Sequence, residues 1–89
     1  MQYDRTVTIT AYTAPGEILM INVAPLEWHH CDVADDCSVC VDLTADNQVI
    51  GIEVIERAKF DLAAVADKHG ISDLVPEIEA AIAAAKPGP

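Results

Sequence analysis

The sequence predicts an α+β fold, in which a small antiparallel β-meander of four strands precedes two carboxy-terminal helices. Three observations lead to this prediction. Residues 6–55 contain four runs with the alternation and β-branched content of half-buried strands. After residue 56, apolar residues recur at the three- and four-residue spacing of one helix face. The chain has 89 residues, which suits one domain, and strands that precede helices are typical of α+β folds.

The first two runs predict a β-hairpin. Residues 6–12, TVTITAY, alternate strictly between apolar and polar side chains. Pro15 and Gly16 then supply turn chemistry, and residues 18–23, ILMINV, resume as a strand. We therefore expect these two runs to pair antiparallel.

The next two runs predict a second hairpin. Residues 37–43, CSVCVDL, and residues 49–55, VIGIEVI, flank a turn that contains Asp46 and Asn47. Both turn residues tolerate the left-handed backbone of a tight connection. Residues 24–36 lie between the hairpins without a sustained period, which indicates a loop with room for a short strand.

The first helix has recognisable ends. Asp61 can cap its first turn, and Phe60 can pack against Val65 as a hydrophobic staple. Gly70 suits a left-handed stop, with Ile71 placed to fold back on the last turn. The predicted apolar stripe consists of Leu62, Val65, Ala66 and His69.

A second helix is expected to begin between Asp73 and Pro76, because proline is tolerated only in a first turn. Its predicted apolar side consists of Leu74, Ile78, Ile82 and Ala85. Alanines favour helix but bury little area, so this element needs close approach to a neighbour, for which a partner subunit is one candidate. Residues 57–86 are thus the predicted helical part of a single domain spanning residues 1–89, and residues 87–89 a frayed tail.

The charge distribution excludes several classes of partner. The formal net charge is −10, and no Lys or Arg occurs between Arg5 and Arg57. Nucleic acids and anionic membranes are bound by clustered basic residues, so neither is expected as a partner. A basic protein partner fits better. The amino terminus has no secretory signal pattern, so we expect a cytoplasmic protein whose cysteines remain thiols or ligate a metal.

Histidines and cysteines crowd into residues 29–40, and they form the only candidate metal site. A zinc or other transition-metal site there would use Cys31, Cys37, Cys40 and one of His29 and His30, because adjacent histidines on an extended chain point opposite ways. Against this, a strand over residues 37–43 turns the two cysteines of the C-x-x-C pair to opposite faces. We favour the interpretation in which the cysteines act as small apolar residues and the protein needs no cofactor.

Other chemistries lack part of their pattern. The C-x-x-C pair does not precede a helix, as a thioredoxin-like pair does. Asp32, Asp35 and Asp36 lack the spacing of a calcium loop and indicate a solvated acidic turn. No phosphate-binding or nucleophile motif is present, so we assign no catalytic residue and expect a protein that is not an enzyme; a small-molecule enzyme is the third hypothesis. His69 is interpreted as a helix cap and Trp28 as a core or interface anchor.

Two stretches, TAPGEILMINV and VDLTADNQVIGIEVI, resemble the bacterial Domain of Unknown Function 2283 family over roughly residues 6–66. The chain departs from the family pattern at Thr13, Met20, Thr44 and Asn47. The resemblance implies a small β-meander with a carboxy-terminal helix and no established activity. It also implies that the protein is similar to the smaller members of toxin–antitoxin pairs. The matching positions are Tyr12, Glu17, Leu19, Ile21, Val41, Asp42, Leu43, Val49, Gly51, Ile52, Glu53 and Val54.

The sequence therefore favours a homodimeric interaction or accessory protein, an antitoxin-like binder of a basic partner. The acidic loop of residues 27–42 is its expected contact surface. A dimer is expected because four strands leave apolar area and sheet edges to be covered. A metal-binding module that uses the segment from His29 to Cys40 is the second hypothesis.

Overall fold

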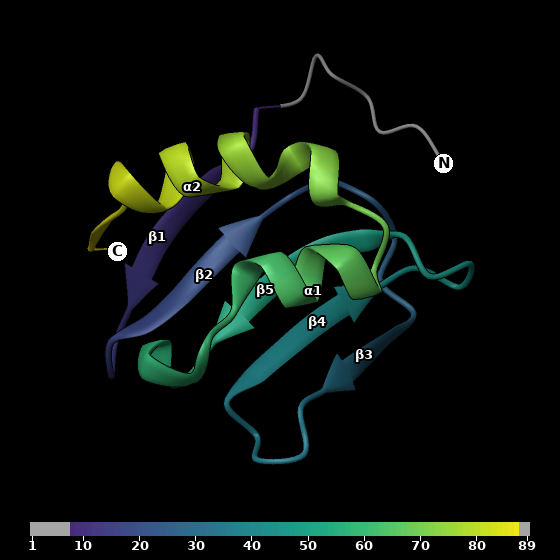
Figure 1. Ribbon diagram of the computed structural model, residues 1–89, viewed down its shortest axis with the longest axis horizontal. Helices are drawn as coiled ribbons and strands as arrows, with labels where there is room; N and C mark the ends of the chain where they lie inside the picture. The colour runs from purple at the N-terminus through teal and green to yellow at the C-terminus, as the bar shows by residue number, and fades with distance from the viewer. Residues whose placement is uncertain (1–7, 88–89) are drawn as a thin grey trace.

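Within residues 8–87, the part of the chain that the computed structural model describes, six strands form one sheet and two helices lie across one of its faces (Figure 1). The α+β prediction with two carboxy-terminal helices is confirmed, but the expected number of four strands is wrong. The strands are β1 (Thr10–Ala14), β2 (Ile18–Asn22), β3 (His30–Val33), β4 (Val39–Leu43), β5 (Val49–Val54) and β6 (Lys86–Pro87). The helices are α1 (Leu62–Lys68) and α2 (Val75–Ala83), preceded by the 3-10 turns η1 (Arg57–Lys59) and η2 (Ser72–Leu74).

The strand order is β3-β4-β5-β2-β1-β6, which differs from a meander. In a meander, β2 would pair with β4, the first strand of the second hairpin. Here β2 instead pairs antiparallel with β5, the second strand of that hairpin. The two most apolar strands thereby lie at the centre, where both edges of each are paired with a neighbouring strand. The residues between β2 and β4 pass to the outer edge of β4, where β3 forms.

Both predicted hairpins are present. In the first, Ala14 is paired with Ile18 around a turn in which Gly16 and Glu17 have φ angles of 85° and 63°. Its first strand begins at Thr10, later than predicted, and residues 6 and 7 of the prediction lie outside the described residues. In the second hairpin Asn47 has the expected left-handed conformation, with a φ angle of 65°.

A β-bulge separates Asp42 from Leu43 in the pairing of β4 with β5. Asp42 is paired with Gly51 and Leu43 with Val49, so Ile50 has no partner on β4. The carbonyl of Ile50 instead accepts hydrogen bonds from the backbone after β2, at 2.8 and 3.0 Å. In a regular strand, Val49 and Gly51 would face the same side of the sheet. Ile50 is the extra residue of the bulge, so Val49 instead points into the core while Gly51 faces the opposite side.

The two strands beyond the predicted four lie at the edges of the sheet, and one of them, β3, lies within residues 24–36, where the sequence left room for a short strand. β3 pairs with β4, and β6 pairs parallel with β1 through Tyr12–Lys86 and Thr13–Pro87. The prediction of a helix up to residue 86 is therefore wrong, since α2 ends at Ala83. Pro87, expected in a frayed tail, belongs to β6, and residues 88 and 89 lie outside the described residues.

The predicted cap at Asp61 and the predicted stop at Gly70 act as expected in α1. The Asp61 carboxylate accepts a hydrogen bond from the Ala64 amide at 3.1 Å. Gly70, with a φ angle of 71°, ends the helix, and the Ile71 amide bonds back to the Ala66 carbonyl at 2.8 Å. Ile71 is then fully buried beneath the helices. These contacts fix α1 above the half of the sheet that contains β4 and β5 (Figure 1).

One apolar core lies between the sheet and the helices. On the helix side of the core, Ile71 from the connection after α1, Leu74 from η2 and Ile78 from α2 pack against side chains of the strands. The strand side of the core consists of Ile9, Leu19, Ile21, Val23, Val39, Val41, Leu43, Val49, Ile52 and Val54. Among the described residues, no helix has the length and apolar character needed to cross a lipid bilayer.

Candidate functional site

The face of the sheet opposite the helices presents two rows of side chains. Strand registers place Cys31, Asp42, Gly51 and Asn22 in one row across β3, β4, β5 and β2. The second row is Val33, Cys40, Glu53 and Met20. Cys40, Asp42, Glu53 and Met20 are half-buried, and they alternate along their strands with core residues, which turns them away from the helices. These polar and sulfur-containing side chains therefore gather on the face that α1 and α2 leave uncovered, called the uncovered face below.

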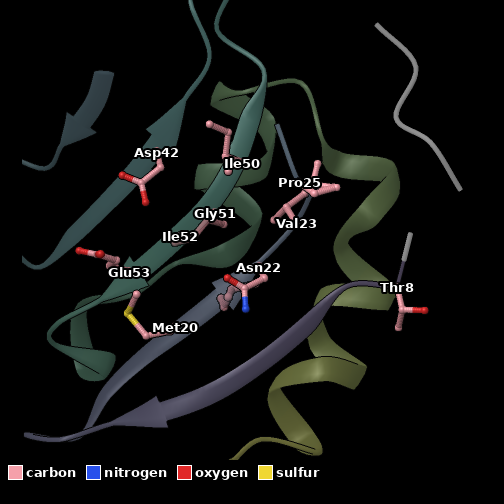
Figure 2. Close-up of a pocket in the computed structure, with 12 residues that line it drawn as sticks. Thr8, Met20, Asn22, Val23, Pro25, Asp42, Ile50, Gly51, Ile52 and Glu53 are labelled. Carbon is pink, nitrogen blue, oxygen red and sulfur yellow. The ribbon is translucent and has the colours of Figure 1, made fainter. Parts of the chain in front are cut away.

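An open groove of about 340 Å³ lies on this face between β2 and β5 (Figure 2). Gly51 is one of its lining residues, and the β2 and β5 backbones approach closely there, because a Cβ atom on Gly51 would lie 2.9 Å from the Ile21 carbonyl oxygen. The carboxylates of Asp42 and Glu53 lie along one side in Figure 2. The apolar and neutral polar residues that line it include Thr8, Met20, Asn22, Val23, Pro25 and Ile50.

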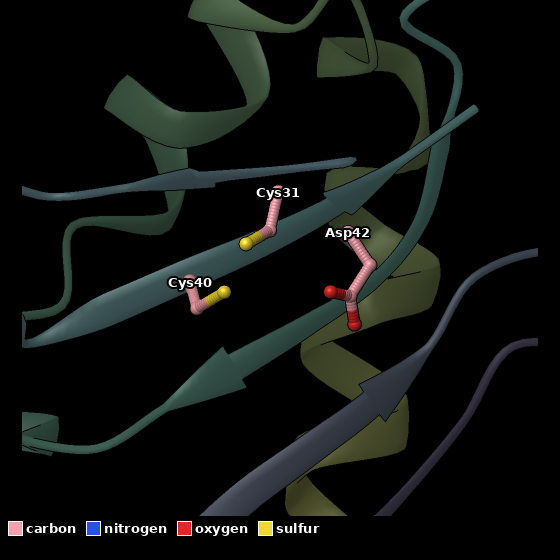
Figure 3. Close-up of side chains that lie close together, drawn as sticks. All are labelled: Cys31, Cys40 and Asp42. Carbon is pink, nitrogen blue, oxygen red and sulfur yellow. The ribbon is translucent and has the colours of Figure 1, made fainter. Parts of the chain in front are cut away.

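Two thiols and a carboxylate converge beside the groove (Figure 3). The Sγ atoms of Cys31 and Cys40 and a carboxylate oxygen of Asp42 all lie within 4.8 Å of one another. Cys31 is directly opposite Asp42 across the β3–β4 pairing, and Cys40 is two residues before Asp42 on β4. Since all three positions share one face, the two strands hold the donor atoms together without any loop.

The environment of this cluster favours the neutral form of the Cys40 thiol. Burial raises the pKa of the Cys40 thiol to about 12, helped by its hydrogen bond with Cys31 and by the nearby carboxylates of Asp42 and Glu53. A thiol with so high a pKa is a poor nucleophile at neutral pH. The Trp28 indole N–H donates to Oδ1 of Asp42 at 3.3 Å, which orients the carboxylate.

The structure brings together only two of the five metal-ligand candidates. Cys31 and Cys40 meet, whereas Cys37 lies exposed in the turn before β4, with a φ angle of 60°. The expectation that residues 37–43 are extended throughout is therefore wrong at its first residues, because β4 begins only at Val39. His29 and His30 are also outside the cluster, and their Nδ1 atoms lie 2.9 Å apart. The prediction that adjacent histidines point opposite ways is wrong, because β3 begins only at His30.

Asp42 was not among the sequence candidates. Its two-residue spacing from Cys40 in a predicted strand was a usable signal, since such residues share a face. The pairing of Cys31 with Asp42 had no comparable signal, because β3 was not predicted as a defined strand.

Asp32 differs from the predicted solvated turn. It lies in β3 on the helix side, where Oδ2 contacts Nζ of Lys68 at 2.8 Å and Nε2 of His69 at 3.2 Å. The hydrogen bond from Lys68 holds the pKa of Asp32 below its ordinary value. The His69 side chain, which is only 9% exposed, therefore contacts Asp32 on β3, and His69 is also the residue that caps the carboxy-terminal end of α1. Asp36 does lie in an exposed turn, where bonds from Ser38 lower the pKa of its carboxyl.

Trp28 is 59% exposed, so its predicted role as a core anchor is wrong, and a role at an interface stays a prediction.

No family model, curated protein or solved structure matches this chain. The resemblance to the Domain of Unknown Function 2283 family therefore stays an expectation, and the site has to be interpreted from its own chemistry.

Proposed function

We propose that this protein is a cytoplasmic binding module, which holds a basic segment of a protein partner in the groove on its uncovered face. The main support is the groove itself, which combines an apolar lining with carboxylates and in which none of the lining residues within the described part of the chain is basic. Lys and Arg side chains have the complementary form, an aliphatic stem that ends in a cation. The sequence predicted that the contact surface is the loop of residues 27–42. The proposed contact surface is instead the face of the sheet opposite the helices, where Asp42 also lies.

The size of the groove limits what it can hold. About 340 Å³ is at the small end of ligand sites, enough for one or two side chains. Met20, Val23 and Ile50 would contact the aliphatic stem, and Glu53 would face the cation. The net charge of −10 would speed encounter with a basic partner and make it depend on salt. An antitoxin-like role is one biological setting for such an interaction.

The experiment uses two synthetic octapeptides, one with alternating Leu and Lys and one with alternating Leu and Glu. We expect amide NMR shifts at Met20, Gly51 and Glu53 with the Lys peptide only, weakening as salt is added. Glu53→Gln should weaken binding about fivefold. This change in Kd corresponds to ~1 kcal/mol, the upper value for one surface ion pair. Glu79→Gln removes the same charge from the exposed side of α2 and should change nothing. Shifts that map elsewhere, or equal binding of both peptides, would contradict the proposal.

The proposal includes a homodimer formed along the outer edge of β3. Four residues of β3 offer an edge without Lys or Pro, and Val33 and Trp28 nearby are 46% and 59% exposed. The uncovered face is less suitable, because face-to-face pairing would bring Asp42 and Glu53 of two chains together. Light scattering should show a dimer that Val33→Lys converts to a monomer; a wild-type monomer at high concentration would rule the dimer out.

A further inference from the structure

We propose that Cys31, Cys40 and Asp42 form a binding site for a thiophilic metal ion, with zinc as the best fit. The site is separate from the groove function, although Asp42 borders both. It also differs from a site built from the C-x-x-C pair and a histidine, because Cys37, His29 and His30 lie outside it.

The geometry comes from strand pairing. Figure 3 shows both sulfur atoms and the carboxylate turned toward a common point on the uncovered face. Zinc binds sulfur at about 2.3 Å and carboxylate oxygen at about 2.0–2.2 Å, so tetrahedral ligands lie about 3.5–4 Å apart. The three donor atoms already lie within 4.8 Å of one another, so zinc binding would require them to approach by no more than about 1 Å.

The donor types select the class of ion. Two thiolates prefer zinc and other soft or borderline ions to magnesium or calcium, which need a shell of oxygen atoms. The hydrogen bond from Trp28 to Oδ1 of Asp42 leaves Oδ2 for the metal, and such outer contacts orient metal ligands. Cys31 is exposed, so the fourth coordination position faces solvent and would take a water molecule.

Binding of a divalent metal ion leaves the net charge of the cluster unchanged. Each thiol loses one proton to the solvent as its sulfur ligates the ion, so one divalent cation replaces two protons. The cluster holds one negative charge before and after, from Asp42 first and from the complex later. The acidic side of the groove therefore keeps its charge. Affinity should rise steeply with pH, by up to ~100-fold per unit, because two protons are released for each ion.

The test is a cobalt(II) titration of the full chain with a phosphine reductant, which keeps the thiols reduced. We expect one ion per chain, thiolate-to-cobalt absorption in the near ultraviolet and the visible bands of tetrahedral cobalt. Zinc should displace the cobalt and raise the thermal midpoint of the protein. A pH indicator should report about two protons released per ion.

Variants separate this site from other uses of the same segment. Cys31→Ser and Cys40→Ser should each weaken cobalt binding by more than about tenfold, the scale seen even for outer contacts at metal sites, and abolish part of the near-ultraviolet band. Asp42→Asn should weaken binding but keep that band. Cys37→Ser is the matched control, because it removes a thiol that lies outside the cluster, and it should bind as the wild type does.

Three results would overturn the proposal: no cobalt spectrum in the reduced protein, equal loss in Cys37→Ser, or unchanged binding in both cluster variants. Circular dichroism and urea unfolding check that each variant is folded, and Cys40→Ala replaces Cys40→Ser if the half-buried hydroxyl prevents folding. Glu53→Gln should weaken the Lys peptide but not cobalt, so failure of one function is distinguishable from failure of the other.

Discussion

The two faces of the sheet differ although the same strands form both. On β5, Ile52 is 1% exposed and faces the helices, whereas its neighbour Glu53 is half-buried on the other face. On β4, Val41 lies in the core, and Cys40 and Asp42 on either side of it lie in the candidate metal cluster. The covered face thus supplies stability by burying apolar area. The uncovered face can hold thiols and carboxylates without disturbing the packing of the core. Substitutions on adjacent residues should separate the two contributions.

The largest effect is expected for Ile52→Ala. The side chain is packed among residues of the core, so its removal should lower the free energy of unfolding by about 2–5 kcal/mol. The adjacent change Glu53→Gln should stay within about 0.5 kcal/mol, because it lies away from the core. Urea unfolding followed by circular dichroism measures both. Similar values for the two variants would mean that the faces do not differ in this way.

A smaller effect is expected for Gly51→Ala, which tests the boundary between the faces. The added Cβ would lie 2.9 Å from the Ile21 carbonyl oxygen, so β2 and β5 would have to shift apart. We expect a loss of about 1–3 kcal/mol, as for other overpacked sites, with faster amide exchange in both strands. Wild-type stability and exchange rates would show that this close approach is unimportant.

The smallest effect is expected for Asp32→Asn, at the edge of the covered face. The lowered pKa of Asp32 means that its contact with Lys68 stabilises the fold above the ordinary value of 3.8 and is lost as pH falls through the lower folded value. Asp32 in turn raises the pKa of Lys68, so the contribution is present below the ordinary 10.5 and is lost as pH rises through the higher folded value. The variant should therefore be less stable between these limits and equal to the wild type beyond both.

Urea midpoints across the pH range measure this difference, which should be smaller than that for Gly51→Ala because the Lys68 side chain is 67% exposed. Asp67→Asn controls for the loss of one exposed charge on α1. A constant difference between Asp32→Asn and the wild type at all pH values would show that the ion pair is not its cause.

Local interactions account for what could be predicted. Asp61 caps α1, Gly70 ends it, and Asn47 makes the turn of the second hairpin, each through contacts within a few residues. Alternation also identified the strands that became β1, β2, β4 and β5, because burial on one face imposes a period of two. The candidate site was predicted only in part. Cys31 and Cys40 were named, but Asp42 was not, and Cys37 and both histidines lie elsewhere.

The sequence by itself determined the α+β class, the two hairpins, the two ends of α1 and the acidic charge, because propensity, alternation and charge are properties of short segments. Only the tertiary structure decided that β2 would pair with β5, that β3 would join the edge of β4, and that Cys31 would lie opposite Asp42. These contacts join segments that are distant along the chain, and their energy depends on how the whole core packs. The edge strands are short, β3 is only partly buried and β6 is exposed, so their own residues carry too weak a pattern to specify them.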